Sequence, residues 1–193
     1  MASEVASSRE NRIEDLLAEA QKFCASMGLR ENLIREITWA EDDWTFILKI
    51  DALLETAAKE IIRRSLKREA ESDLVVEGES RDFIDSLPIN GRTSIVRLLK
   101  DANCPSDDVN FIESVRRLRN SFAHNIRSVD QSLIEVIKQH QDKSRLIKDI
   151  TSSREFSEEG MIRLSEGDGY LLRFAIADAT MSFLTVAYQI EPK

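Results

Sequence analysis

The stretch from Trp44 to Lys67 repeats apolar residues every three or four positions, and this periodicity constrains the fold more than any other feature. The interval matches the turn of an α-helix and predicts one long helix. Its wide apolar face needs several partners, which places it at the centre of a bundle. Asp42 or Asp43 can cap its start, and a basic far end suits the helix dipole. The apolar positions are Phe46, Ile47, Ile50, Leu53, Leu54, Ala57, Ala58, Ile61, Ile62 and Leu66, and the basic ones are Arg63, Arg64, Lys67 and Arg68.

The remaining sequence also reads as helices joined by short breaks. Glycine and proline, which interrupt helices, number only 6 and 3 among 193 residues, while 42% of residues are hydrophobic and 32% are charged. This composition is typical of a helix-rich globular chain of one-domain size. We therefore expect an all-α fold, with an up-and-down helical bundle over residues 41–193 and an N-terminal helical extension over residues 1–40. Further helices are expected near residues 8–27, 81–87, 95–99, 109–122, 133–137 and 170–188.

Individual residues predict where these helices begin and end. Gly28 is expected to close the first helix, because glycine readily adopts the left-handed conformation of a helix terminus. Thr93 is expected to cap the helix that follows it, and either Ser128 or Asp130 to cap the one expected near residue 133. That helix could continue past His140. We interpret His140 as a surface residue, since no partner for it is visible in the sequence.

Charge and cysteine content restrict the possible functions. The formal net charge of -8 disfavours a surface that coats nucleic acid indiscriminately, so any such contact should be local. Cys24 and Cys104 are isolated, which indicates neither a disulfide nor a zinc site. We expect no metal and no cofactor, and a reducing cytoplasm is the simplest location. The apolar stretch 170–190 contains Arg173 and Asp178, which favours a buried helix over a membrane span, and no membrane association is expected.

The segment Arg119-Asn120-Ser121-Phe122-Ala123-His124 holds the best candidate chemistry. Histidine can transfer protons near neutral pH, and arginine can hold a phosphate with a planar fork of donors. Five residues along an α-helix correspond to a rotation of about 140°, so Arg119 and His124 can converge only if the helix ends or distorts between them. The alternative is an ordinary structural role, with His124 at a helix end and Arg119 in a surface ion pair.

This helix end resembles the HEPN superfamily, whose signature is R-x4-6-H. Arg119, Asn120 and His124 match the family's arginine, the polar residue after it and the histidine. The surrounding sequence from Val115 to His124 is most similar to the branch of mannitol operon repressor-like proteins. By helix order the resemblance covers about residues 44–188 and leaves the first forty outside. It implies a small helical bundle of the HEPN type, in which the Arg/His pair often cleaves RNA without a metal.

The resemblance and the chemistry together imply site roles. His124, if neutral, could remove the proton of a 2′-hydroxyl, and Arg119 would stabilise charge developing on the phosphate. Asn120 could donate to the phosphate or orient the histidine, and Ser121 is a weaker candidate for the same work. Proteins with this signature commonly form homodimers that bring two motifs into one cleft. Such a cleft would double the local cluster of Arg116, Arg117, Arg119 and Arg127, which could then bind RNA phosphates despite the acidic chain.

Two carboxylates on the long helix are further site candidates. Asp51 and Glu55 lie one helical turn apart, and related ribonucleases often carry a polar or acidic residue there. A supporting catalytic role is one interpretation. The more usual explanation for two acidic residues four apart is a solvated helix face, and structural ion pairs also perturb carboxylates.

Three functions remain open at the level of the sequence. The first is a metal-independent HEPN-type endoribonuclease, such as a toxin or defence effector, with an RNA substrate and an antitoxin or regulatory protein as partner. The second is a non-catalytic regulator or protein-interaction module, similar to the mannitol repressor branch. The third, direct repression by DNA binding, is the least favoured because the chain is acidic and contains no convincing basic recognition helix.

Overall fold

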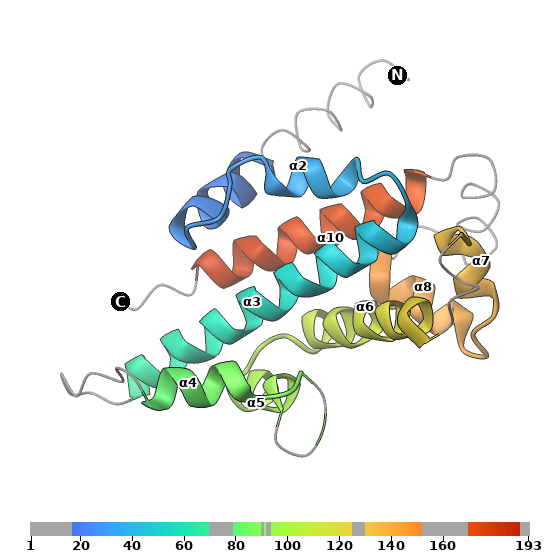
Figure 1. The fold of residues 1–193 in the computed structure, drawn as a ribbon. Helices are drawn as coiled ribbons and strands as arrows, with labels where there is room; N and C mark the ends of the chain where they lie inside the picture. The colour runs from blue at the N-terminus through green and yellow to red at the C-terminus, as the bar shows by residue number, and fades with distance from the viewer. Residues whose placement is uncertain are drawn as a thin grey trace, which may run out of the picture.

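The computed structural model describes residues 17–69, 79–89, 91, 94–124, 130–151 and 170–189. All regular secondary structure in these ranges is helical, and they contain no strand. The expected all-α class is therefore confirmed. Figure 1 shows α10 (Tyr170–Gln189) alongside α3 (Asp43–Glu69), with α2 (Leu33–Thr38) on one side of this pair and α6 (Ser106–His124) on the other.

The long central helix predicted from the periodicity is α3. It packs against α2, α4 (Glu79–Ser86), α5 (Ile95–Asp101), α6 and α10. Asp42 caps its start, since Asp42 Oδ1 accepts a hydrogen bond from the Thr45 backbone N–H at 2.6 Å. The apolar stripe that predicted the helix is buried from Phe46 to Ile62, whereas Leu66 at its far end is 41% exposed.

The described part of the first helix, residues 17–26, joins the same hydrophobic core as α3 and α10. Gly28 closes this helix as expected, with a positive φ of 70°. The N–H groups of Gly28 and Leu29 donate to the carbonyls of Ala25 and Cys24 at 3.0 and 2.7 Å, which is the Schellman arrangement. Phe23, Cys24, Ile34 and Ile37 bury their side chains in that core. The N-terminal segment thus packs on the bundle as far back as residue 17.

A buried ion pair connects the start of α3 to α10 and to α7 (Leu133–Lys138). Arg173 Nε donates to Asp43 Oδ1, and both side chains are at most 10% exposed. The other oxygen, Asp43 Oδ2, accepts from the Leu133 backbone N–H at 2.5 Å. Arg173 also donates to the Ala40 carbonyl and lies over the Phe46 ring. The expectation that α10 is a core helix agrees with this burial, and no helix in the described ranges is long and apolar enough to span a membrane.

Two helix starts differ from the sequence predictions. Ser94, rather than Thr93, is the N-cap of α5, and its hydroxyl accepts from the Arg97 N–H. Ser132, rather than Ser128 or Asp130, caps α7 through a capping box with Glu135. The helix also stops at Lys138 instead of passing His140, and a turn then leads into α8 (Lys143–Thr151).

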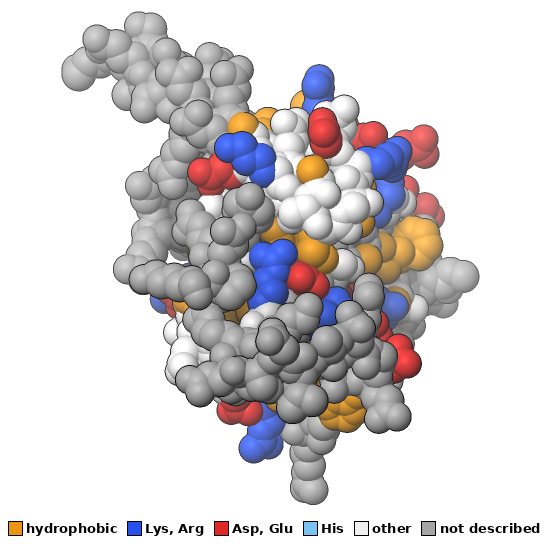
Figure 2. Space-filling view, turned by 90° about the vertical axis from the view of Figure 1, so that its left-hand side faces the viewer, with side chains coloured by type: hydrophobic (Ala, Val, Ile, Leu, Met, Phe, Trp, Pro, Cys, Tyr) orange, Lys and Arg blue, Asp and Glu red, His pale blue; other side chains and the backbone are white. Residues whose placement is uncertain are grey.

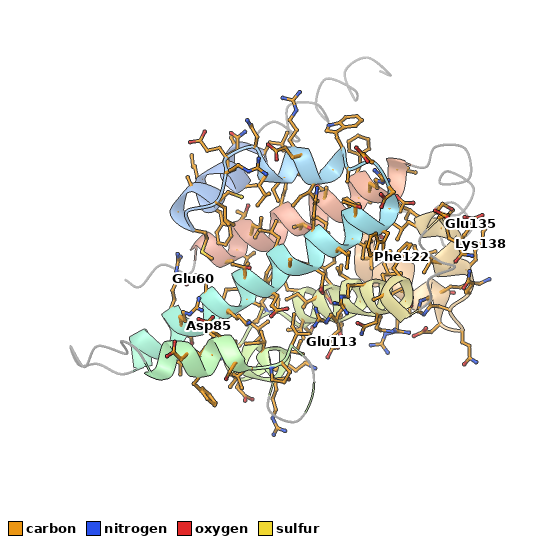
Figure 3. All side chains as sticks on the ribbon, viewed as in Figure 1. Glu60, Asp85, Glu113, Phe122, Glu135 and Lys138 are labelled. Atoms are coloured by element: carbon orange, nitrogen blue, oxygen red, sulfur yellow. The ribbon has the colours of Figure 1, made fainter. Side chains whose placement is uncertain are left out.

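Charged side chains of both signs share the described surface in the space-filling view (Figure 2). On the face shown in Figure 2, acidic and basic side chains alternate, and the described residues there form no extended basic patch. In Figure 3, Glu60 and Asp85 lie close to each other where α3 meets α4, and Arg63 pairs with both. Glu135 and Lys138 extend from the outer side of α7, whereas Phe122 lies on the inner side of α6.

Candidate functional site

The last turns of α6 separate a buried face from an outward face. Val115, Leu118 and Phe122 are enclosed by the core, with at most 1% exposure. The polar residues between them are partly exposed, because the helical period places them on the other side of the helix. These are Arg116, Arg117, Arg119, Asn120 and Ser121, so the motif predicted from the sequence lies on the outward half of α6.

The helix continues through the whole Arg/His motif. The condition for Arg119 and His124 to converge within one chain, a helix that ends or distorts between them, is not met, because α6 remains α-helical to His124. The backbone positions of these two residues are therefore about 140° apart around the helix axis, with Asn120 between them on the outward arc. The side chain of His124 and all of Arg127 lie outside what the structure describes. Arg119 and His124 of one chain are therefore not brought together by a break in α6.

The side chain of Arg119 is directed along this outward arc. Its Nη1 donates to Asn120 Oδ1 at 3.2 Å, and its Nε lies 3.9 Å from Asp51 Oδ2. The side chain remains 35% exposed. Arg119 is therefore held at two points, yet its side chain stays partly exposed.

Asp51 is the main contact between α3 and this face of α6. Arg116 Nη1 forms an ion pair with Asp51 Oδ2 and lies 3.6 Å from Glu55 Oε2. The Asp51 side chain is only 7% exposed, so the solvated-face explanation is wrong for this residue. Burial raises the pKa of the Asp51 carboxyl, which Arg116 and Arg119 oppose. Glu55 is more exposed and also pairs with Lys59 at 2.8 Å.

The other edge of the outward face adjoins His140, whose interpretation from the sequence is that of a surface residue with no visible partner. That interpretation is wrong: His140 is half-buried, and its Nε2 lies 3.0 Å from Ser121 Oγ. The Ser121 hydroxyl also donates to the Arg117 carbonyl at 3.0 Å. Arg117 pairs with Asp142 at 2.6 Å, which fixes the turn between α7 and α8 against α6. Burial lowers the pKa of the His140 imidazole, the Arg117 charge lowers it further, and Asp142 acts in the opposite direction.

The Ser121–His140 contact was not predictable from local spacing. The two residues are 19 positions apart, and their contact depends on α7 ending before His140. One signal was present in the sequence: Ser132 and Glu135 form the S-x-x-E pattern of a capping box, which fixes the start of a short α7. With α7 placed in this way, a turn around residue 140 follows.

Comparison with known proteins adds no assignment, since no family model, curated protein or solved structure matches the chain. Among the described residues, no group of three or more His, Cys, Asp or Glu side chains is arranged to hold a metal ion. The site on α6 is therefore interpreted from its own residues: three arginines, an amide, a hydroxyl, a buried carboxylate and a histidine on the neighbouring turn.

Proposed function

We propose that the protein is a metal-independent endoribonuclease of the HEPN type, acting as a toxin or defence effector. The observation that carries this proposal is the outward face of α6, where Arg116, Arg119, Asn120 and Ser121 lie together in the segment that ends at His124. Guanidinium, amide and hydroxyl groups are the donors that bind phosphate oxygens. The all-α bundle around a long central helix is compatible with the proposed family.

The reaction follows from the chemistry of these groups. His124 removes the proton of the 2′-hydroxyl, and the 2′-oxygen forms a bond to the adjacent phosphorus. The bond from phosphorus to the 5′-oxygen then breaks, and its electron pair stays on that oxygen, which takes up a proton. The products are a 2′,3′-cyclic phosphate and a 5′-hydroxyl. Arg119 stabilises the charge on the phosphoryl oxygens, and Asn120, which accepts from Arg119, has an amide N–H group available to donate to the same phosphate.

A homodimer would explain how an acidic chain binds RNA, and how Arg119 and His124 act on one phosphate although they lie on different sides of α6. In one chain, Asp51 partly neutralises Arg116 and Arg119, and Arg119 and His124 start from different sides of α6. A homodimer with two α6 faces across a symmetric cleft would surround one phosphate with Arg119 of one chain and His124 of the other. RNA can then bind locally although the chain has a net charge of -8.

The direct test is RNA cleavage in EDTA by purified protein, using single-stranded RNA and transfer RNA. We expect cleavage by the wild type, a loss on the order of 10²–10⁴-fold for His124→Ala and on the order of 10²–10³-fold for Arg119→Ala. Arg97→Ala, an exposed arginine on α5, serves as the matched control and should retain full activity. Absence of cleavage by the wild type, or equal cleavage by His124→Ala, contradicts the proposal.

The composite dimeric site has its own test. Arg119→Ala and His124→Ala proteins are mixed, and their subunits are allowed to exchange. If each cleft combines Arg119 of one chain with His124 of the other, the mixed dimer holds one complete pair and recovers activity that neither parent has. A protein that sediments as a monomer at active concentrations contradicts this arrangement.

One observation favours a second function, that of a protein-interaction module. The rings of Trp39 and Phe174 meet edge to face with centroids 5.6 Å apart, and they remain 59% and 43% exposed. Exposed aromatic residues are enriched at protein interfaces. A regulator that uses this pair should lose its protein partner in Trp39→Ala and retain it in His124→Ala, whereas a toxin's phenotype should depend on His124.

A further inference from the structure

We propose that Ser121 and His140 carry out the second proton transfer of the cleavage reaction. Ser121 protonates the leaving 5′-oxygen, and His140 then donates a proton to Ser121. This inference rests on the ribonuclease function proposed above and names a step of the same site. The R-x4-6-H signature does not include residue 140 and names no proton donor for the leaving group.

The hydrogen bonds around Ser121 indicate that a proton can pass from His140 to Ser121. A hydroxyl has one proton, and Ser121 directs it to the Arg117 carbonyl at 3.0 Å. The Oγ is then the acceptor for a proton on His140 Nε2, 3.0 Å away. Rotation of the hydroxyl away from the Arg117 carbonyl turns its proton outward, toward a substrate, without breaking the contact to His140.

The position of Ser121 on α6 suits a proton donor that works opposite His124. The two residues are three positions apart on one continuous helix, so their backbones lie on neighbouring turns of the same side. An in-line displacement needs the base at the attacking oxygen and the acid at the leaving oxygen, on opposite sides of the phosphorus. A phosphate lying across this helix face would have one of these groups near each end.

The protons and electrons of the step balance within these residues. As the bond between phosphorus and the 5′-oxygen breaks, its electron pair stays on that oxygen, which takes the proton of the Ser121 hydroxyl. Ser121 Oγ takes a proton from Nε2 of a His140 imidazolium, which becomes a neutral imidazole. The proton that His124 removed from the 2′-hydroxyl remains on His124, and exchange with water restores both histidines.

The groups that face His140 define the pH range of this step. Arg117 on α6 repels the imidazolium, Asp142 on the following turn attracts it, and burial disfavours it. The pKa of His140 is therefore below the ordinary value of 6.5. The donor form is lost as the pH rises through that lowered pKa, so kcat/KM should fall on the alkaline side of an acidic optimum. Removal of His140 should abolish that alkaline fall.

The experiment compares two leaving groups. RNA releases a poorly acidic alcohol that needs a proton donor, whereas a 4-nitrophenyl ester of a nucleoside 3′-phosphate releases a stable phenolate that does not. Ser121→Ala and His140→Gln should lose on the order of 10²-fold or more on RNA and less than about 10-fold on the nitrophenyl ester. His124→Ala should lose activity on both substrates. The double variant should be no slower on RNA than the slower single variant, because both residues serve one proton.

Each other outcome overturns the inference in a recognisable way. Equal losses on both substrates would give Ser121 and His140 a structural role, and the thermal unfolding midpoints of the variants would reveal it. Normal RNA cleavage by Ser121→Ala and His140→Gln would remove both residues from the reaction and leave the proposed function intact. Failure of the wild type to cleave either substrate would overturn the proposed function and this inference together.

Discussion

Asp51 on α3 forms an ion pair with Arg116 on α6, although the Asp51 side chain is almost completely buried. Burial raises the pKa of the Asp51 carboxyl, Arg116 and Arg119 act in the opposite direction, and the charge of Glu55 also raises it. The Asp51 carboxylate thus lies beside both Arg116 and Arg119 on the outward face of α6.

Replacement of Asp51 by Asn should separate these two effects. A carboxyl whose folded pKa is raised contributes stability below its unfolded pKa, and this contribution is lost as the pH rises through the folded pKa. The unfolding free energy of the wild type relative to Asp51→Asn should therefore increase as the pH is lowered from 7 toward 4. Urea denaturation across this range measures it. A relative decrease would show that the arginines, rather than burial, control this carboxyl.

The Arg173–Asp43 pair should contribute far more to stability than an exposed pair. Arg173→Ala leaves the Asp43 carboxylate buried without its guanidinium, which should cost about 3–5 kcal/mol of unfolding free energy. Arg145→Ala is the matched control, because Arg145 pairs with Asp149 but is 68% exposed, and it should cost less than about 1 kcal/mol. Similar losses in the two variants, measured by chemical denaturation, would contradict the structural account.

The titration of His140 should respond in opposite directions to its two charged neighbours. Arg117→Gln removes a positive charge and should raise the pKa of His140, whereas Asp142→Asn removes a negative charge and should lower it. The midpoint in the wild type should lie below the ordinary 6.5. NMR detection of the imidazole C–H resonances measures all three midpoints. A wild-type midpoint above 6.5 would mean that burial does not dominate at this site.

The capping box at α7 should hold the turn that carries His140. Ser132→Ala removes the acceptor for the Glu135 N–H and should cost on the order of 1 kcal/mol. The substitution should also weaken the contact between His140 and Ser121, visible as a shift of the His140 titration toward the ordinary value. Ser86→Ala provides the control, because it removes an exposed hydroxyl near the end of α4. It should change neither the unfolding free energy nor the titration of His140.

The sequence predicted those features that depend on local physics. The period of the apolar residues located α3, and Gly28 ended the first helix because its backbone requires a positive φ. The caps were predicted less accurately where two candidates stood close together. Ser94 caps α5 because its extended backbone directs its hydroxyl at the helix N–H groups.

The site was predicted only along α6, because its remaining members come from distant parts of the chain. Asp51 could be identified as a candidate, but its burial depends on how α3 packs against α6. His140 was missed because its partner is 19 positions away, and the capping box of Ser132 and Glu135 marks where α7 begins but not which residue the turn after it contacts. The sequence also could not show that α6 continues through His124. The polar residues after His124 are compatible both with a helix that ends before it and with one that continues to it.

The two carboxylate oxygens of Asp43 bind groups on α7 and α10, two helices that are synthesised at different times. Asp43 and α7 are synthesised before α10, yet the Asp43 carboxylate that accepts from the Leu133 N–H also needs Arg173 of α10 for its charge. A nascent chain without α10 would hold an unpaired carboxylate at the anchor of α7, and the turn with His140 would lack firm support. Docking of α10 would therefore complete the support of α7 and of the turn that carries His140.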